Sequence, residues 1–140
     1  MADHLKLSEQ LCFPLYAASK AIVRQYGPCL EEFDLTYTQY IALLALFENG
    51  PMTVQELGEA LYLDSGTLSP LLKKLEAKGY VAKERGEDGR YVNVVLTENG
   101  EVLRGKLSKI PENVGKCIPL SAEEAKELYT SCYKVLEVLK

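Results

Sequence analysis

The chain has 140 residues, of which 47% are hydrophobic and 26% are charged, so it can build the core of one domain and lacks the composition of a disordered chain. Its net charge of −4 argues against a nucleic-acid binder that is basic throughout. No apolar run approaches the roughly 20 residues that cross a bilayer, and the first residues, MADHLKLSEQL, lack the pattern of a secretion signal. We therefore expect a cytoplasmic protein with no membrane partner.

Four cysteines and one histidine are the residues best suited to bind a metal ion: Cys12, Cys29, Cys117, Cys132 and His4. None of the cysteines forms a C-x-x-C pair, so the spacing typical of zinc ligands is absent. We predict no metal site and no cofactor, and thiols kept in a reducing compartment.

The first predicted element is a helix over residues 8–26. Pro14 suits its first turn, because the N–H that proline lacks would have no helical partner there. Gly27 and Pro28 are expected to end the helix. Apolar residues recur at steps of three and four along it, which predicts one buried face. The members of that face are Leu11, Leu15, Ala18, Ile22 and Tyr26.

A second helix is expected from Thr36, whose spacing to Gln39 is that of a capping box. The stretch Asn49-Gly50-Pro51 should end it. The residues predicted for its apolar face are Tyr40, Leu43, Leu44 and Phe47.

Two further helices, joined by a tight turn, form the pattern of a helix-turn-helix. Thr53 and Glu56 have capping-box spacing and open a short helix to about residue 61. Asp64 is placed to cap a longer helix over residues 65–78, which Gly79 closes. The residues expected to be buried in the short helix are Val54, Leu57, Ala60 and Leu61.

The character of the sequence then changes from helical to β-prone. Residues 80–83 and 91–96 are two β-prone runs on either side of ERGEDG, which is rich in turn residues. This pattern predicts a hairpin with a charged tip. A hairpin directly after a helix-turn-helix is the layout of a winged helix.

The last part of the chain is expected to be helical again. Thr97 can cap a helix that runs towards Lys109, and Pro111 and Pro119 bracket a less regular segment. SAEE, from Ser121, is a third capping box before the last helix. The apolar face of that helix is Ala125, Leu128, Cys132, Val135, Leu136 and Leu139.

The predicted fold class is mainly α with a small β-hairpin wing. Residues 35–97 would form a winged helix-turn-helix DNA-binding domain, and residues 1–34 and 98–140 a helical dimerisation region. The apolar faces of the terminal helices have no obvious cover in their own chain. A homodimer is the economical solution, because symmetric pairing uses the same face twice.

Charge is distributed in a way that fits DNA binding by this domain. Residues 62–96 carry a net charge of +1, and the rest of the chain carries −5. A recognition helix reads base edges with its N-terminal residues, where this sequence places small hydroxyls, and lysines one to two turns later can bind phosphate. In the wing, Arg90 can enter the minor groove, and Asp88 can pair with its guanidinium.

The candidate residues for binding double-stranded DNA are Ser65, Thr67, Ser69, Pro70, Lys73, Lys74, Arg85, Asp88 and Arg90. The plainer interpretation of the same residues is that the hydroxyls cap the helix and that the lysines are solvated.

Several stretches resemble one family of regulators. DGRYVNVVLTENG fits the wing pattern D-x-R-x-x-x-aliphatic-x-L-T-x-x-G of the MarR family. LCFPLYAASKAIVRQY, FDLTYTQY and LYLDSGTLSPLLKKLE resemble its organic-hydroperoxide-sensing branch, the OhrR repressors. The resemblance covers nearly the whole chain. It implies a homodimeric winged-helix repressor, not an enzyme, that releases its operator when an organic hydroperoxide oxidises it.

The resemblance also implies the sensor residues. In that branch the cysteine of LCFPLY is the peroxide sensor, which falls on Cys12, and the two tyrosines that hydrogen-bond it fall on Tyr26 and Tyr37. The residues themselves agree, because a helix N-terminus favours a thiolate, and a thiolate reacts with peroxide to give sulfenic acid. Tyr16, one turn from Cys12, can line the same pocket.

Spacing adds a constraint on this sensor. Cys12 and Tyr26 are 14 residues apart, which is about 21 Å on a straight helix at about 1.5 Å per residue. A contact between them must therefore cross the dimer interface. The alternative is that Tyr16, Tyr26 and Tyr37 only fill that interface as amphipathic side chains.

The fate of the oxidised sensor stays open. Some members of the branch recruit a low-molecular-weight thiol, and others form a disulfide with a second cysteine near the C-terminal part. Cys117, in the segment before Pro119, resembles that resolving cysteine in rough position. Cys29 and Cys132 are expected to be packing residues.

Three other functions fit parts of the sequence. A MarR-type repressor can be released by a phenolic or other small ligand, which would make Cys12 a bystander. A thiol-dependent peroxidase would use the same cysteine with the winged helix as scaffold. A winged helix can also serve protein contacts alone.

Overall fold

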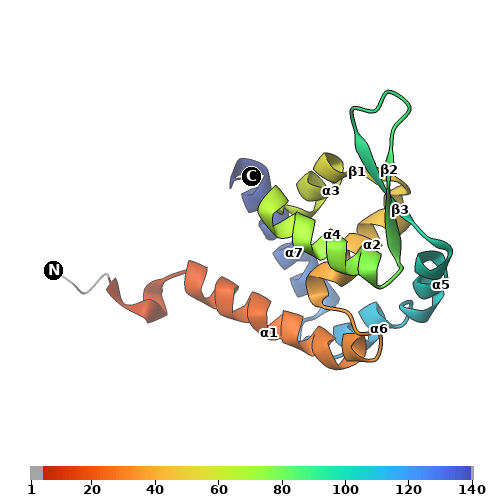
Figure 1. Ribbon diagram of the computed structural model, residues 1–140. Helices are drawn as coiled ribbons and strands as arrows, with labels where there is room; N and C mark the ends of the chain where they lie inside the picture. The colour runs from red at the N-terminus through yellow and green to blue at the C-terminus, as the bar shows by residue number, and fades with distance from the viewer. Residues whose placement is uncertain (1–4, 140) are drawn as a thin grey trace. The chain divides into compact units, whose positions relative to one another are not determined.

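The computed structural model describes residues 5–139 and is mainly helical, with one small antiparallel sheet (Figure 1). The predicted fold class is confirmed. None of the helices in residues 5–139 has the length and apolar character needed to span a membrane. The ends of the predicted dimerisation region, residues 1–4 and 140, lie outside the described part. The chain forms two compact units, the first of which ends at Tyr37, and each unit is described by itself.

The first unit is dominated by one long helix, α1 (Cys12–Glu31), preceded by the short 3-10 helix η2 (Leu7–Glu9). Pro14 lies in the first turn of α1, as predicted. The expected start at residue 8 is wrong, because η2 and α1 are separate elements.

The predicted stop at Gly27 and Pro28 is also wrong, because α1 continues to Glu31 with Pro28 inside it. Proline has the φ angle of a helix and costs only its missing N–H bond and a local clash, which a helix near its end can absorb. Three residues after the end of α1, Asp34 adopts a left-handed conformation with φ 55°. The N–H of Leu35 then donates to the carbonyl of Leu30 at 3.2 Å.

The second unit begins with α2 (Tyr37–Asn49), whose first residue belongs to the first unit. The predicted start and end of this helix are confirmed to within one residue. Its buried face is shifted from the prediction, because Leu44 is exposed and Phe47 is half-buried. The buried residues are Gln39, Tyr40, Ala42, Leu43, Ala45 and Leu46.

The helix-turn-helix is confirmed as α3 (Val54–Leu61) and α4 (Ser65–Ala77). The capping box of α3 is present in full, since the N–H of Glu56 donates to Thr53 Oγ1 at 3.0 Å and the N–H of Thr53 donates to Glu56 Oε1 at 2.9 Å. Asp64 caps α4 by accepting the N–H of Thr67 at 2.8 Å. Gly79, with φ 81°, follows the end of α4.

Burial in α3 is narrower than predicted. Leu57 is fully buried, but Ala60 is exposed and Val54 and Leu61 are half-buried. Gly58, the neighbour of Leu57, is buried as well, and the absence of a side chain there leaves room for the carbonyl of Leu63. The helix therefore packs through a small patch around Leu57.

The sheet has the order β1-β3-β2, in which β2 (Val81–Arg85) and β3 (Val92–Leu96) form the predicted hairpin. The hairpin extends beyond the helices as a wing (Figure 1). The third strand, β1 (Met52–Thr53), was not predicted; it pairs with β3 through Met52 and Val94. Two residues between two helices carry no alternating pattern, so the sequence offers no signal for β1.

The base of the wing is closed by Thr97 and Gly100. The Thr97 hydroxyl donates to the carbonyl of Gly79 and accepts the N–H of Gly100 at 3.1 Å. Gly100 lies so close to the carbonyl of Tyr80 that a Cβ on it would stand 2.2 Å from that oxygen. These two residues of the wing pattern thus join the end of α4 to the start of the next helix.

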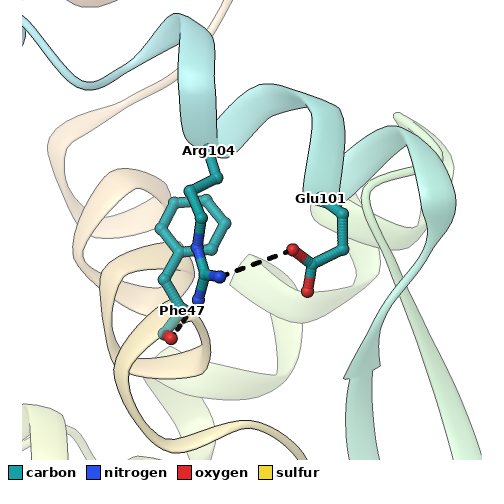
Figure 2. Close-up of polar contacts among 3 residues, drawn as sticks. All are labelled: Phe47, Glu101 and Arg104. Atoms are coloured by element: carbon teal, nitrogen blue, oxygen red, sulfur yellow. Dashed lines mark hydrogen bonds and ion pairs between the residues drawn. The ribbon is translucent and has the colours of Figure 1, made fainter.

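That next helix, α5 (Glu98–Lys106), is shorter than predicted. Arg104 on α5 reaches the C-terminal end of α2: its Nη2 donates to the carbonyl of Phe47, and its guanidinium lies 5.1 Å from the centre of the Phe47 ring. Glu101 forms an ion pair with the same guanidinium, with 3.7 Å between Glu101 Oε2 and Arg104 Nη1 (Figure 2).

The remainder of the chain consists of α6 (Ile110–Gly115) and α7 (Ala122–Leu139). The segment after Pro111 was expected to be irregular, but α6 occupies most of it because Pro111 lies in the first turn, where proline is favoured. The capping box of α7 is confirmed by reciprocal hydrogen bonds between Ser121 and Glu124.

We predict that Gly100→Ala destabilises the fold and that Gly105→Ala does not. A Cβ at Gly100 meets backbone, and relieving such overpacking costs about 1–3 kcal/mol or more. A Cβ at Gly105, on the same helix, meets no described atom within 4 Å, so alanine there should stabilise by up to about 1 kcal/mol. Urea unfolding at equal protein concentrations measures both. Equal stability of the two variants would contradict the prediction.

Candidate functional site

The candidate DNA-contacting residues all lie on the surface. Those of α4 are exposed, while Leu68, Leu71, Leu72 and Leu75 on the same helix are buried. The helix therefore turns its leucine stripe inward and its hydroxyls and lysines outward. This arrangement presents the N-terminal end of α4 with a polar face that can approach a base edge or a phosphate.

Two local features shape the N-terminal half of α4. Asp64, which caps the helix, has its pKa lowered by hydrogen bonds from the backbone N–H of Thr67 and of Gly66, so it remains charged at neutral pH. Pro70 lies inside the helix and provides no N–H for the carbonyl four residues earlier. The first turns of α4 are thus held by a side-chain cap.

The wing tip is organised through the backbone, which corrects one prediction. Asp88 lies in the turn, and its Oδ1 accepts the backbone N–H of Arg90 at 3.0 Å. The structure records no ion pair between Asp88 and the Arg90 guanidinium in residues 5–139, because a short carboxylate two residues before a backbone N–H in a turn bonds to it locally. Arg85 braces the same turn by donating to the carbonyl of Gly89 at 3.1 Å.

Cys12 is the first residue of α1 and is exposed. Tyr16, one turn later, is exposed as well, and Lys20 donates to its hydroxyl at 3.2 Å. The predicted position of the cysteine at a helix N-terminus is confirmed, and its thiol can be reached by a small oxidant.

Tyr26 and Tyr37 lie together in the first unit. Their ring centres are 4.9 Å apart in an edge-to-face arrangement. Burial, and secondarily the charge of Cys29, raises the pKa of Tyr26; burial, and secondarily Tyr26, raises the pKa of Tyr37. Both hydroxyls therefore stay protonated at neutral pH and can donate to a thiolate.

The structure does not bring Cys12 to these tyrosines within one chain. α1 is continuous from Cys12 through Tyr26, so the two lie about 21 Å apart along the helix axis at about 1.5 Å per residue. Because this helix is unbroken, Cys12 and Tyr26 of the same chain cannot touch.

The remaining cysteines differ in their surroundings. All four are free thiols. Cys117 is exposed in the turn after α6, where its backbone N–H donates to Val114 and its thiol lies 3.7 Å from the carbonyl of Asn113. Cys29 and Cys132 are half-buried, on α1 and α7.

One polar contact beside the recognition helix was missed by the sequence analysis. Gln39, expected only as a capping-box partner, is buried with 3% of its surface exposed, and its Oε1 accepts a hydrogen bond from Lys78 Nζ at 3.0 Å. The two residues are 39 positions apart. No local pattern links them, so the sequence carries no signal for the pair.

Known proteins similar to this chain are transcriptional regulators. The family model of the SarA/Rot transcriptional regulators matches residues 24–107. The chain is 46% identical over 138 residues to an organic hydroperoxide resistance transcriptional regulator of Bacillus subtilis, covering 98% of this chain and 94% of that one. It is 45% identical over 123 residues to the HTH-type regulator SarZ of Staphylococcus aureus, covering 87% and 83%.

Solved structures of AbfR from Staphylococcus epidermidis are also similar. Overoxidized AbfR bound to DNA matches with a TM-score of 0.79 and 34% identity, over 99% of this chain and 98% of that one. Reduced AbfR bound to DNA matches with a TM-score of 0.79, and its disulfide form with 0.69.

We predict that Tyr26 and Tyr37 titrate above the usual pKa of a tyrosine. Because their pKa values are raised above the unfolded value of about 10, the stability they contribute is present below that pH and is lost as the pH rises through the folded pKa values. A pH titration followed by absorbance at 295 nm measures this. In the double variant Tyr26→Phe, Tyr37→Phe, the part of the absorbance rise that occurs at the highest pH should be lost. Loss of an early portion instead would contradict the raised pKa values.

Proposed function

The chain belongs to the SarA/Rot family of transcriptional regulators, in the organic-hydroperoxide branch of the MarR-type proteins, and from that membership we propose a homodimeric repressor that leaves its operator when an organic hydroperoxide oxidises Cys12. The observation that carries the proposal is the exposed cysteine at the first position of α1. Among the relatives of the chain, one regulator is named for organic hydroperoxide resistance, and another, AbfR, has been solved in overoxidized, reduced and disulfide forms.

DNA binding is proposed for the exposed face of α4 and for the wing. Ser65, Thr67 and Ser69 would meet base edges, and Lys73 and Lys74 would meet phosphates. Arg90 would enter the minor groove, from a turn that Asp88 and Arg85 hold in shape. Pro70 is exposed in the second turn of α4 and would lie close to the DNA.

Dimerisation is proposed through the two terminal parts of the chain. In a single chain, large apolar side chains of each part remain open to solvent, which a soluble monomer rarely tolerates over a wide area. In the first unit they include Leu7, Leu11, Phe13, Leu15 and Val23. On α7 they include Leu128, Tyr133, Val135, Val138 and Leu139.

The proposed sensing step is a two-electron oxidation of Cys12. Its thiolate attacks one oxygen of the hydroperoxide, an S–O bond forms, the O–O bond breaks, and the alkoxide leaves and takes up a proton as alcohol. The sulfur becomes a sulfenic acid, which thiols can reverse. Tyr26 and Tyr37 of the second protomer would hold the reduced thiolate by hydrogen bonds, with Tyr16 at the edge of the pocket.

Cys117 is the proposed resolving residue. Its thiolate would attack the sulfenic sulfur of Cys12 in the other protomer, form a disulfide and release water; a low-molecular-weight thiol can take its place by the same chemistry. Exposure of Cys117 in a turn supports this role, since attack requires access. AbfR, 33% identical, has been solved in a disulfide form.

Transmission to DNA would follow from the position of the sensor. Oxygen or a disulfide on Cys12 would break hydrogen bonds between protomers, and the two recognition helices would change their separation. Operator half-sites about 34–36 Å apart tolerate little such change. We propose a gene regulator of the cytoplasm rather than an enzyme, because the family is one of transcriptional regulators.

We predict that an organic hydroperoxide releases the wild-type protein from DNA but not Cys12→Ser. Fluorescence anisotropy with a labelled duplex from the region upstream of its own gene measures both. The matched control is Cys132→Ser, a half-buried cysteine on α7, which should respond as the wild type does. Release of Cys12→Ser would contradict the sensor assignment, and binding without release of any protein would favour a small ligand as signal.

Cys117→Ser should keep the response to peroxide but change its product. We expect a dimer band on a non-reducing gel of the oxidised wild-type protein and a monomer band for Cys117→Ser, whose mass should show sulfenic acid or a small-thiol adduct. A monomer band for the wild type as well would rule out the intersubunit disulfide.

A further inference from the structure

The hydrogen bond between Gln39 and Lys78 joins the first turn of α2 to the end of the recognition helix. Lys78 is the C-cap residue of α4, and its ammonium donates to Gln39 Oε1 at 3.0 Å. Gln39 is the one polar residue in the buried set of the described chain. A buried amide oxygen without a donor is costly, so this bond has a preferred partner and a preferred direction.

The inner stripe of α4 has no such direction. Four leucines form the inner stripe of the helix, and apolar contact is not directional. A leucine stripe therefore sets how far α4 lies from the core, but it resists a small slide or rotation of the helix weakly. At the C-terminal end of α4, the bond from Lys78 opposes such movement and ties the helix to α2, while the ion pair between Glu76 Oε1 and Lys83 Nζ at 3.5 Å ties it to β2.

The turn of α2 that accepts this bond also carries a proposed sensor residue. Tyr37 is the first residue of α2, two positions before Gln39, and its ring contacts Tyr26. Residues in one helical turn move together, because backbone hydrogen bonds fix their relative positions. A displacement of Tyr37 is thus a displacement of the acceptor that holds the recognition helix.

We propose that Gln39 and Lys78 are positioning residues that couple the sensor tyrosines to the recognition helix. The proposal rests on the proposed function, in which oxidation at Cys12 disturbs Tyr26 and Tyr37. When the first turn of α2 moves at Tyr37, the bond from Gln39 to Lys78 moves the end of α4 with it. The polar face of α4 then no longer fits the major groove of the operator.

The test compares operator affinity before and after oxidation in four single variants and in the double variant Gln39→Met, Lys78→Met. Gln39→Met removes the acceptor at nearly constant volume, and Lys78→Met removes the donor. Gln39→Glu keeps an acceptor and should rescue. Lys74→Met is the matched control, because Lys74 is an exposed lysine of the same helix proposed to bind phosphate. Circular dichroism checks folding, and the labelled upstream duplex, with cumene hydroperoxide as oxidant, gives the dissociation constants.

We expect the ratio of oxidised to reduced dissociation constants to fall at least threefold in Gln39→Met and in Lys78→Met, and no further in the double variant, since one bond is lost in each. Gln39→Glu should keep the wild-type ratio. Lys74→Met should weaken operator binding equally in the reduced and the oxidised protein. It should also lower the slope of log affinity against log salt by about 1. The Gln39→Met slope should equal that of the wild type.

A wild-type ratio in a folded Gln39→Met protein would overturn the coupling. If Gln39→Met does not fold, a wild-type ratio in Lys78→Met, whose side chain is partly exposed, overturns it equally. The coupling would also be overturned if the ratio of oxidised to reduced dissociation constants fell as much in Lys74→Met as in Gln39→Met. The loss of any positive charge on α4 would then explain the effect. If the wild-type protein itself shows no release by peroxide, the proposed function has failed.

Discussion

Burial of α2 is the constraint on which the second unit depends. Six of its residues between Gln39 and Leu46 are buried, and apolar burial is the main source of folding free energy in a small domain. Its two ends carry the directional contacts. Lys78 reaches its first turn from α4, and Arg104 reaches the carbonyl of Phe47 in its last turn from α5. The recognition helix α4 and the helix after the wing, α5, are thereby both bonded to α2.

The elements that could be predicted from sequence are those with local signals. The capping boxes at Thr53 and Ser121 and the cap at Asp64 place three helix starts to the residue, because each is a bond between neighbours in the chain. The wing follows from two β-prone runs on either side of a stretch rich in turn residues. The place of Cys12 at the start of α1 follows from Pro14, which marks a first turn.

What sequence could not give depends on contacts between distant residues or on competing local costs. Pro28 predicts the end of a helix, yet it lies inside the last turn of α1, which continues to Glu31. Asp88 reads as a partner for a guanidinium, yet a backbone N–H is nearer. The pairing of Gln39 with Lys78 joins positions that no period relates. The candidate site was thus predictable as a set of surface residues, and the contacts that position them were not.

The close approach at Gly100 bears on what the wing pattern signifies. Its glycine and threonine serve the junction between the hairpin and α5, where any side chain on Gly100 would collide with the Tyr80 carbonyl. A sequence search keyed to those two positions selects proteins that build the same joint, whichever operator they read. Operator preference has to be sought in other residues, on the outward face of α4 and at the wing tip, which are free to diverge while the joint is kept.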